Sequence, residues 1–245
     1  MKNAIVKGFL TTLSLLTINT FAQQSGTVEY TEKVKLDIHI EGDASILPPG
    51  IPNEYTTMKT LHFTPDESIY SGSGEEEEQE NSMEESDVFV HFSEPEEITY
   101  INFKEGKYID QREFMSRMFL IESPLDSVAW KLTGNRKEIL GYSCMEATCM
   151  IDSTLTTAWF APSINVAAGP AKFNGLPGLI LELITNEGKR IITAASVKFE
   201  DVMDKIIKPK KGKKMSRTEF NKIIDEKGAK MSEDGGPDHI VIKIM

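Results

Sequence analysis

The sequence predicts one α+β domain that is mainly β: a curved antiparallel sheet, as a meander or half-barrel, with one amphipathic helix near the carboxyl end. The first observation is that most of the chain alternates apolar and polar residues with period two between clusters of turn residues. The second is that no crossover helix interrupts this series of strands. A parallel β-α-β nucleotide-binding fold is therefore disfavoured.

Residues 1–22 have the pattern of a cleaved secretory signal. Lys2 and Lys7 precede an apolar run over residues 9–18, and Ala22 supplies a small residue at the expected cleavage point. The run is shorter than the roughly 20 residues that a membrane-spanning helix needs. We therefore expect cleavage after Ala22, export to the periplasm or the cell exterior, a mature domain over residues 23–245, and no transmembrane segment.

The charge of the chain bears on its partners. The whole sequence carries a net charge of −11, and residues 1–22 contain two lysines and no acid, so the mature chain would carry −13. Such a chain repels phosphate backbones and anionic membrane surfaces. We therefore expect no nucleic-acid partner.

The first predicted strands are followed by an acidic segment. Residues 28–40 alternate as a half-buried strand does, and residues 57–63 lead through Pro65 and Asp66 into a further strand, which predicts a hairpin. Residues 72–87 are dense in acids and almost free of large apolar residues, which predicts a flexible, solvated loop. The alternative of a calcium site is disfavoured, because consecutive glutamates do not reproduce the spaced ligands of a calcium loop.

The middle of the chain predicts a meander of strands. Its segments are VFVHF, ITYINF, KYIDQREFMSRMFLIES, VAWKL, EILGYSCMEATCMI and TLTTAWFAP, with turns at KEGK (residues 104–107) and TGNRK (residues 133–137). Two later strands, GLPGLILELI and RIITAASVKFED, are joined by TNEGK, whose composition is typical of a hairpin loop.

One helix is predicted over residues 216–231. Ser216 and Glu219 form a capping box, and Phe220, Ile223 and Ile224 share one face that we expect to cover the concave side of the sheet. The basic residues 205–214 before it have the composition of a solvated linker. The final residues 239–245 alternate again, which predicts a strand that pairs back at the edge of the sheet.

The segment FNGLPGLILEL (residues 173–183) joins a turn to an apolar strand. Pro177 and Gly178 suit the two central positions of a type II turn, the second of which requires a positive φ. Gly175 suits a close backbone approach or a left-handed residue. The strand that follows is apolar on both faces except at Glu182, so we expect a central strand with Glu182 near an edge, a partner or water.

These motifs resemble the GLPGLI family of exported proteins, found chiefly in Bacteroidetes. The matching residues occur in order: Ile139, Gly141, Tyr142, Cys144, Ala158, Trp159, Gly169, Pro170, Gly175, Leu176, Pro177, Gly178, Leu179 and Ile180. The resemblance implies an exported, mainly antiparallel β protein, and it carries over no catalytic residue because the family's function is undetermined. The second cysteine and the acidic insertion depart from the family pattern, which leaves any shared role for the thiols or that loop open.

Catalytic and metal-binding patterns are not evident. Cys144 and Cys149 lie five positions apart on one predicted strand, about 17 Å when extended, whereas a disulfide needs Cα atoms within about 7 Å. We expect two unpaired, partly buried thiols unless the chain bends between them. The four histidines have no zinc-ligand spacing, no G-x-S-x-G pentapeptide occurs, and no carboxylate pair stands out. We name no catalytic residue and no cofactor, and the metal question stays open.

The sequence favours an exported cell-envelope protein that binds without catalysis. The aromatic residues near the family motif could line a groove for an apolar small molecule, or serve an envelope protein partner, although core packing also explains them; they are Trp130, Trp159, Phe160 and Phe173. Two alternatives stay open. One is a hydrolase with Cys144 or a carboxylate in the active role, and the other is a metal-handling protein that uses histidines, methionines and the acidic loop.

Overall fold

The computed structural model describes residues 25–35, 37–40, 54–73, 96–151, 153–233 and 240–243. The predicted signal peptide, most of the acidic loop at residues 72–87 and the predicted strand at residues 88–92 lie outside this part of the chain.

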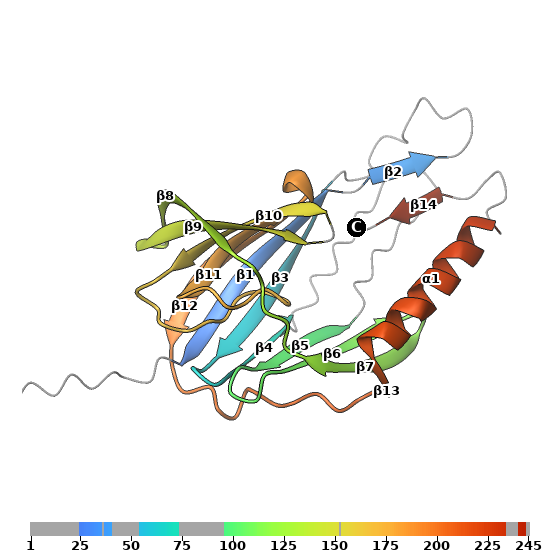
Figure 1. Cartoon of the computed structure of the whole chain (residues 1–245), viewed down its shortest axis with the longest axis horizontal. Helices are drawn as coiled ribbons and strands as arrows, with labels where there is room; N and C mark the ends of the chain where they lie inside the picture. Colours follow the sequence, from blue (N-terminus) through green and yellow to red (C-terminus); the bar gives the residue numbers. More distant parts are fainter. Residues whose placement is uncertain are drawn as a thin grey trace, which may run out of the picture.

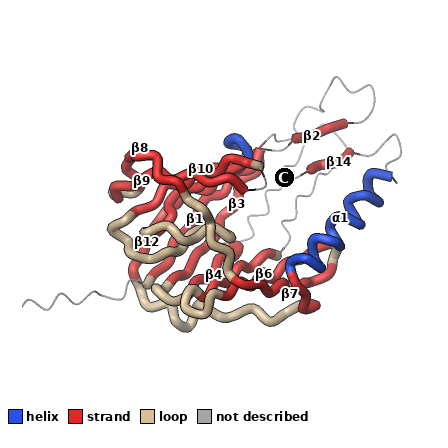
Figure 2. The backbone as a smooth tube through the Cα atoms, viewed as in Figure 1, coloured by secondary structure: helices blue, strands red, loops and turns tan. Residues whose placement is uncertain are grey.

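The described residues form one open, curved sheet of twelve strands (Figures 1 and 2). Along the sheet the order is β13-β7-β6-β5-β4-β3-β1-β12-β11-β10-β9-β8. The bounds are β1 (Gly26–Lys35), β3 (Glu54–Phe63), β4 (Glu67–Gly72), β5 (Glu97–Asn102), β6 (Lys107–Phe114), β7 (Arg117–Pro124), β8 (Lys131–Ile139), β9 (Tyr142–Ile151), β10 (Thr154–Ala161), β11 (Leu179–Thr185), β12 (Arg190–Phe199) and β13 (Lys213–Ser216). All neighbours in this sheet are antiparallel except β13 and β7. The predicted fold class, mainly β with a curved antiparallel sheet and one helix, is confirmed.

The predicted hairpins are largely confirmed. The β3–β4 connection runs through Pro65 and Asp66, the β5–β6 turn occupies residues 103–106, and β11 joins β12 through a short 3-10 turn, η1 (Asn186–Gly188). The predicted turn at TGNRK is wrong, because those residues lie inside β8. The pairing of β8 with β9 shifts register between Leu132 and Arg136, so the residues between them form an irregularity within the strand instead of a turn.

Helix α1 (Arg217–Glu233) begins as predicted. The Ser216 amide donates to Glu219 Oε2 at 2.8 Å, and the Glu219 amide donates to Ser216 Oγ at 3.2 Å, so the capping box is confirmed. Phe220 is buried against Phe119 of β7, with ring centroids 5.3 Å apart. Ile224 is 38% exposed, so the buried face is narrower than predicted. Among the described residues, no helix has the length and apolar character that crossing a membrane would require.

The segments beside the helix differ from expectation. Most of the basic stretch is irregular, as predicted, but Lys213 begins β13, which pairs in parallel with β7. The carboxyl-terminal strand also forms, as β14 (Ile240–Lys243). It pairs with β2 (Asp37–Ile40) in a separate two-stranded sheet, so the predicted pairing at the edge of the main sheet is wrong. Alternation indicates a strand, whereas the choice of partner depends on which free edge lies nearby.

The GLPGLI segment is a structural joint, but its turn is not type II. The Gly178 amide donates to the Leu176 carbonyl at 2.8 Å, and the Leu179 amide donates to the Ile164 carbonyl instead of closing the predicted turn. A Cβ atom on Gly178 would lie 2.4 Å from the Ala161 carbonyl oxygen. Close packing therefore requires glycine there, whereas Gly175 supplies a positive φ of 86° in open space.

Strand β11 is central, as predicted. It lies between β10 and β12, and its buried apolar residues are Leu179, Ile180, Leu181 and Leu183. Glu182 has a partner, because Lys137 of β8 forms an ion pair with it and its side chain is only 15% exposed. The loop between β10 and β11, residues 162–178, adds buried side chains to the same core, among them Ile164 and Phe173.

Candidate functional site

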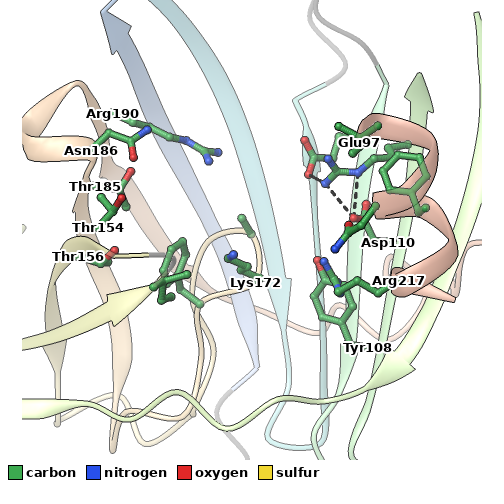
Figure 3. A pocket seen from close by; sticks show the side chains of 17 residues that line it. Glu97, Tyr108, Asp110, Thr154, Thr156, Lys172, Thr185, Asn186, Arg190 and Arg217 are labelled. Atoms are coloured by element: carbon green, nitrogen blue, oxygen red, sulfur yellow. Dashed lines mark hydrogen bonds and ion pairs between the residues drawn. The ribbon is translucent and has the colours of Figure 1, made fainter. Parts of the chain in front are cut away.

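A cavity of about 360 Å³ lies between two regions of the curved sheet (Figure 3). One wall comes from β5, β6 and α1, and it contains Glu97, Tyr108, Asp110, Arg112, Arg217, Phe220, Asn221 and Ile224. The opposite wall comes from β9 to β12, η1 and the loop before β11, and it contains Ile151, Thr154, Thr156, Ala171, Lys172, Phe173, Thr185, Asn186 and Arg190. Segments far apart in the sequence thus supply both walls.

Strand geometry explains the first wall. Tyr108, Asp110 and Arg112 alternate along β6, so their side chains share one face of the sheet. The paired position opposite Arg112 on β5 is Glu97, which lies on the same face. Helix α1 adds Arg217 at its first position, next to this face.

Asp110 is the most buried acid of the cavity, with 1% of its surface exposed. Arg112 holds it: the guanidinium Nε lies 2.9 Å and a terminal nitrogen 2.8 Å from Asp110 Oδ2. Arg112 also forms an ion pair with Glu97. Burial raises the pKa of Asp110, and the Arg112 charge opposes that shift. The arrangement fixes the Arg112 fork and both carboxylates in place.

Asp110 and Arg217 each retain a buried polar atom without a partner. Asp110 Oδ1 and Arg217 Nε make no hydrogen bond to any other described residue. The Arg217 guanidinium carbon lies 4.8 Å from the centroid of the Tyr108 ring, so the cation rests on an aromatic face. Unmade hydrogen bonds at buried groups cost free energy, which makes these two atoms unusual in the cavity wall.

The opposite wall contains a second ion pair. Arg190 Nε donates to Glu32 Oε1 at 2.6 Å, and the Tyr70 hydroxyl donates to Glu32 Oε2 at 3.3 Å. Burial raises the pKa of Tyr70, and the Glu32 charge raises it further. Glu32 and Arg190 come from the neighbouring strands β1 and β12, so sheet pairing places this network at the cavity edge.

The four aromatic residues predicted to form a groove do not come together as one surface. Phe173 lines the cavity, and Trp130 packs beside it with ring centroids 6.4 Å apart and donates from Nε1 to the Asn174 carbonyl. Phe160 is buried in the core. Trp159 lies under the Lys137 ammonium, 4.4 Å from its ring centroid, and does not line the cavity. A ligand-binding role for this set stays a prediction.

The family-motif residues lie in the framework around the cavity. Gly141 has a positive φ of 79° in the β8–β9 turn, next to Tyr142. Gly169 precedes Pro170 in the long loop, and a Cβ there would lie 2.6 Å from Ile180 Cδ1. None of the residues from Gly175 to Ile180 lines the cavity. A structural role for the motif residues stays a prediction.

Cys144 and Cys149 are both free, which confirms the expectation of unpaired thiols. Both are buried on β9, Cys144 completely, so they are more buried than predicted. Burial raises the pKa of Cys144 to about 11 and also raises that of Cys149. The thiolate needed by a nucleophile is therefore disfavoured.

The histidines contribute no metal site within the described part of the chain. His62 shares a 2.9 Å hydrogen bond with the Thr27 hydroxyl, which also bonds to Glu200, and burial lowers the pKa of His62. No group of three or more histidine, cysteine or carboxylate side chains gathers among the described residues. The side chain of His39, all of His91 and His239, and the acidic loop beyond residue 73 lie outside them.

Sequence reasoning missed the charged residues that form the cavity. These are Glu97, Asp110, Arg112, Lys172, Arg190 and Arg217. A signal was present in KYIDQREF, where an acid and a base occupy alternate positions on one face of a strand. Charged side chains on the concave face of a curved sheet are partly removed from water. Because unpaired buried charges are costly, such residues are expected to form ion pairs or to bind a ligand.

Comparison with known proteins gives a consistent result. The family model described as "N-glycanase peptide, N-terminal domain" matches residues 76–221. Two crystal structures of PNGF-II, in space groups C2 and P21, each match with a TM-score of 0.55 and 17% sequence identity over 83% of this chain. The match covers 33% and 34% of those chains, so this chain spans about a third of their length. No curated protein matches. At this identity the likeness to PNGF-II establishes the fold alone.

Proposed function

Because the chain belongs to the N-glycanase peptide, N-terminal domain family, we propose that it is a non-catalytic carbohydrate-binding protein of the cell envelope. Its binding site is the cavity between the β5–β6–α1 wall and the β9–β12 wall. The export signal predicted at residues 1–22 and the resemblance to GLPGLI proteins support the location. The family description names a glycanase, and a domain that accompanies such an enzyme would meet glycans.

The polar lining of the cavity is the observation that carries this proposal. Each sugar hydroxyl both donates and accepts hydrogen bonds, so a sugar site needs donors and acceptors together. Arg112 and Asn221 supply donors, Glu97 supplies acceptors, and Thr154 supplies both. Ile224, which is 38% exposed, offers apolar surface for the C–H face of a sugar ring. This lining suits a hydroxyl-rich ligand better than the apolar small molecule expected from the sequence.

Preorganisation favours binding. Arg112 is held by Asp110 and Glu97, and Arg190 is held by Glu32. Side chains fixed before the ligand arrives lose little conformational entropy on binding. The volume of about 360 Å³ lies within the usual range of small-ligand sites. A cavity of this size fits the end of a saccharide chain.

The same contacts weigh against catalysis. Asp110 is buried, and one of its oxygens is held by Arg112, so it is poorly placed to exchange protons with a substrate. Cys144 lies outside the cavity lining, and its raised pKa disfavours the reactive thiolate. Binding, with hydrolysis left to a separate domain or enzyme, is the role that fits these groups.

Isothermal titration of the full chain with a neutral biantennary N-glycan tests the proposal. Asn221→Ala removes an exposed cavity side chain, and we expect it to weaken binding about fivefold, the effect of one hydrogen bond. Thr218→Ala, on the same helix but outside the cavity, is the matched control and should bind as the parent does. Absence of binding to every neutral and acidic glycan tested, by a folded protein, would overturn the proposal.

A further inference from the structure

We propose that the cavity selects saccharides that carry a carboxylate, and that Arg217 and Lys172 are the groups that meet it. This inference rests on the proposed carbohydrate-binding function and names the class of sugar that the cavity prefers.

Two cations of the cavity lining have no ion-pair partner among the described residues. The lining contains the cations Arg112, Lys172, Arg190 and Arg217 and the acids Glu97 and Asp110. Arg112 forms ion pairs with both acids of the lining, through Oδ2 of Asp110, and Arg190 forms an ion pair with Glu32 behind it. Among the described residues, neither Arg217 nor Lys172 forms an ion pair. The surplus is notable in a chain whose net charge is −11.

The position of the Arg217 guanidinium suits a carboxylate ligand. Its guanidinium carbon lies 4.8 Å from the centroid of the Tyr108 ring, so an aromatic face holds the cation in the cavity wall. Its buried Nε has no acceptor among the described residues. A planar fork of N–H donors binds the two oxygens of a carboxylate together. The amino-terminal end of α1, where Arg217 lies, further favours negative charge.

Lys172 faces Arg217 from the other side of the cavity. Figure 3 shows it on the loop before β11, between the two walls. The residue is exposed, so its flexible side chain can reach a ligand without rearrangement of the core. Its neighbour Phe173 is buried and fixes the loop, as does the bond from the Asn174 side chain to the Lys172 carbonyl at 2.9 Å. The two free cations thus bracket one space.

A matched pair of glycans tests the inference with the full chain. The probes are a biantennary N-glycan capped with sialic acid, whose carboxylate is the only added charge, and the same glycan after removal of the sialic acids. We expect the sialylated glycan to bind at least about tenfold more tightly, as charge-assisted bonds allow. A glycan sulfated at the same branches separates a carboxylate preference from a preference for any anion.

Three single-charge variants assign the effect. Arg217→Gln and Lys172→Gln should each remove most of the preference for the sialylated glycan. Lys210→Gln removes the same charge from an exposed residue outside the cavity and should leave the preference unchanged. Because Lys172 is exposed, its variant is expected to stay folded even if the Arg217 variant does not.

Each contrary outcome has a separate meaning. Equal affinity for the two glycans would overturn the carboxylate inference and leave the proposed function standing. A preference that survives both Arg217→Gln and Lys172→Gln would overturn the assignment of residues, and equal binding of the sulfated glycan would overturn the carboxylate class. Failure of all the glycans to bind would overturn the proposed function as well.

Discussion

The hydroxyl of Tyr30 donates a 2.6 Å hydrogen bond to the main-chain carbonyl of Ile180, 150 positions later in the chain. Tyr30 lies on β1 and Ile180 on β11, and β12 separates these strands in the sheet. The register of β10 and β11 shifts beside Ile180, so the strand ladder is interrupted there. The Tyr30 hydroxyl thus reaches past β12 and provides a hydrogen-bond donor for a buried carbonyl of β11, the strand that follows the GLPGLI turn.

Tyr30→Phe should lower the free energy of unfolding by about 1–3 kcal/mol, because the buried Ile180 carbonyl would lose its phenol donor. Urea unfolding followed by circular dichroism measures this change. Tyr142→Phe is the matched control, since its hydroxyl makes no hydrogen bond to another described residue. An equal loss in the two variants would contradict the role given to the Tyr30 bond.

Gly178→Ala should destabilise the fold more than Gly175→Ala. Both positions have positive φ, which costs a non-glycine residue about 1–3 kcal/mol, but only at Gly178 would a Cβ meet another residue, 2.4 Å from the Ala161 oxygen. The larger Gly178→Val change should prevent folding. Thermal unfolding of the two alanine variants measures the difference. Equal thermal midpoints for the two variants would show that the requirement for glycine at position 178 comes from its positive φ and not from close packing.

Stability should depend on pH through Asp110. Its pKa is raised in the folded protein above the ordinary 3.8, so the folded state binds the proton more tightly than the unfolded chain does. This stabilising contribution is complete below pH 3.8 and is lost as the pH rises through the folded pKa. The free-energy difference between the parent and Asp110→Asn should therefore decline from pH 3.5 towards neutrality. A difference that grows over this range would contradict the raised pKa.

The two thiols should be slow to react in the folded protein. Burial raises the pKa of Cys144 to about 11, and the pKa of Cys149 is also raised, so little thiolate is present near neutral pH. We expect iodoacetamide to modify both cysteines only after unfolding, as two mass additions without prior reduction. Protein that needs a reductant before both sites react would contain a disulfide, contrary to the free thiols of the structure.

Local patterns predicted the elements that depend on neighbouring residues. The capping box at Ser216 and Glu219, the hairpin at Pro65 and the burial of the GLPGLI strand all follow from side chains a few positions apart. The predicted turns failed where distant contacts replaced local ones. The Leu179 amide bonds to the Ile164 carbonyl, so the type II turn cannot close, and pairing with β9 draws residues 133–137 into β8.

The candidate site could not be predicted as a unit. Alternation indicated that Asp110 and Arg112 share a face, but it did not show that this face would look toward Arg190 and Lys172. The predicted aromatic groove shows the same limit, because Trp159 contacts Lys137 while Phe173 lines the cavity. Composition and period describe one strand at a time, whereas a cavity depends on how the whole sheet bends.

By itself the sequence determined the fold class, the single helix with its cap, the central strand after Gly178 and the two thiols without a disulfide, because these follow from periodicity, turn chemistry and the reach of a short segment. Only the tertiary structure decided that β2 and β14 pair in a sheet separate from the main one. It also decided that Gly178 must be glycine because the Ala161 carbonyl leaves no room for a Cβ atom. It also decided which charges remain unpaired. Sheet curvature brings residues 97–112, 151–190 and 217–224 around one cavity, and such convergence depends on distances that no local pattern encodes.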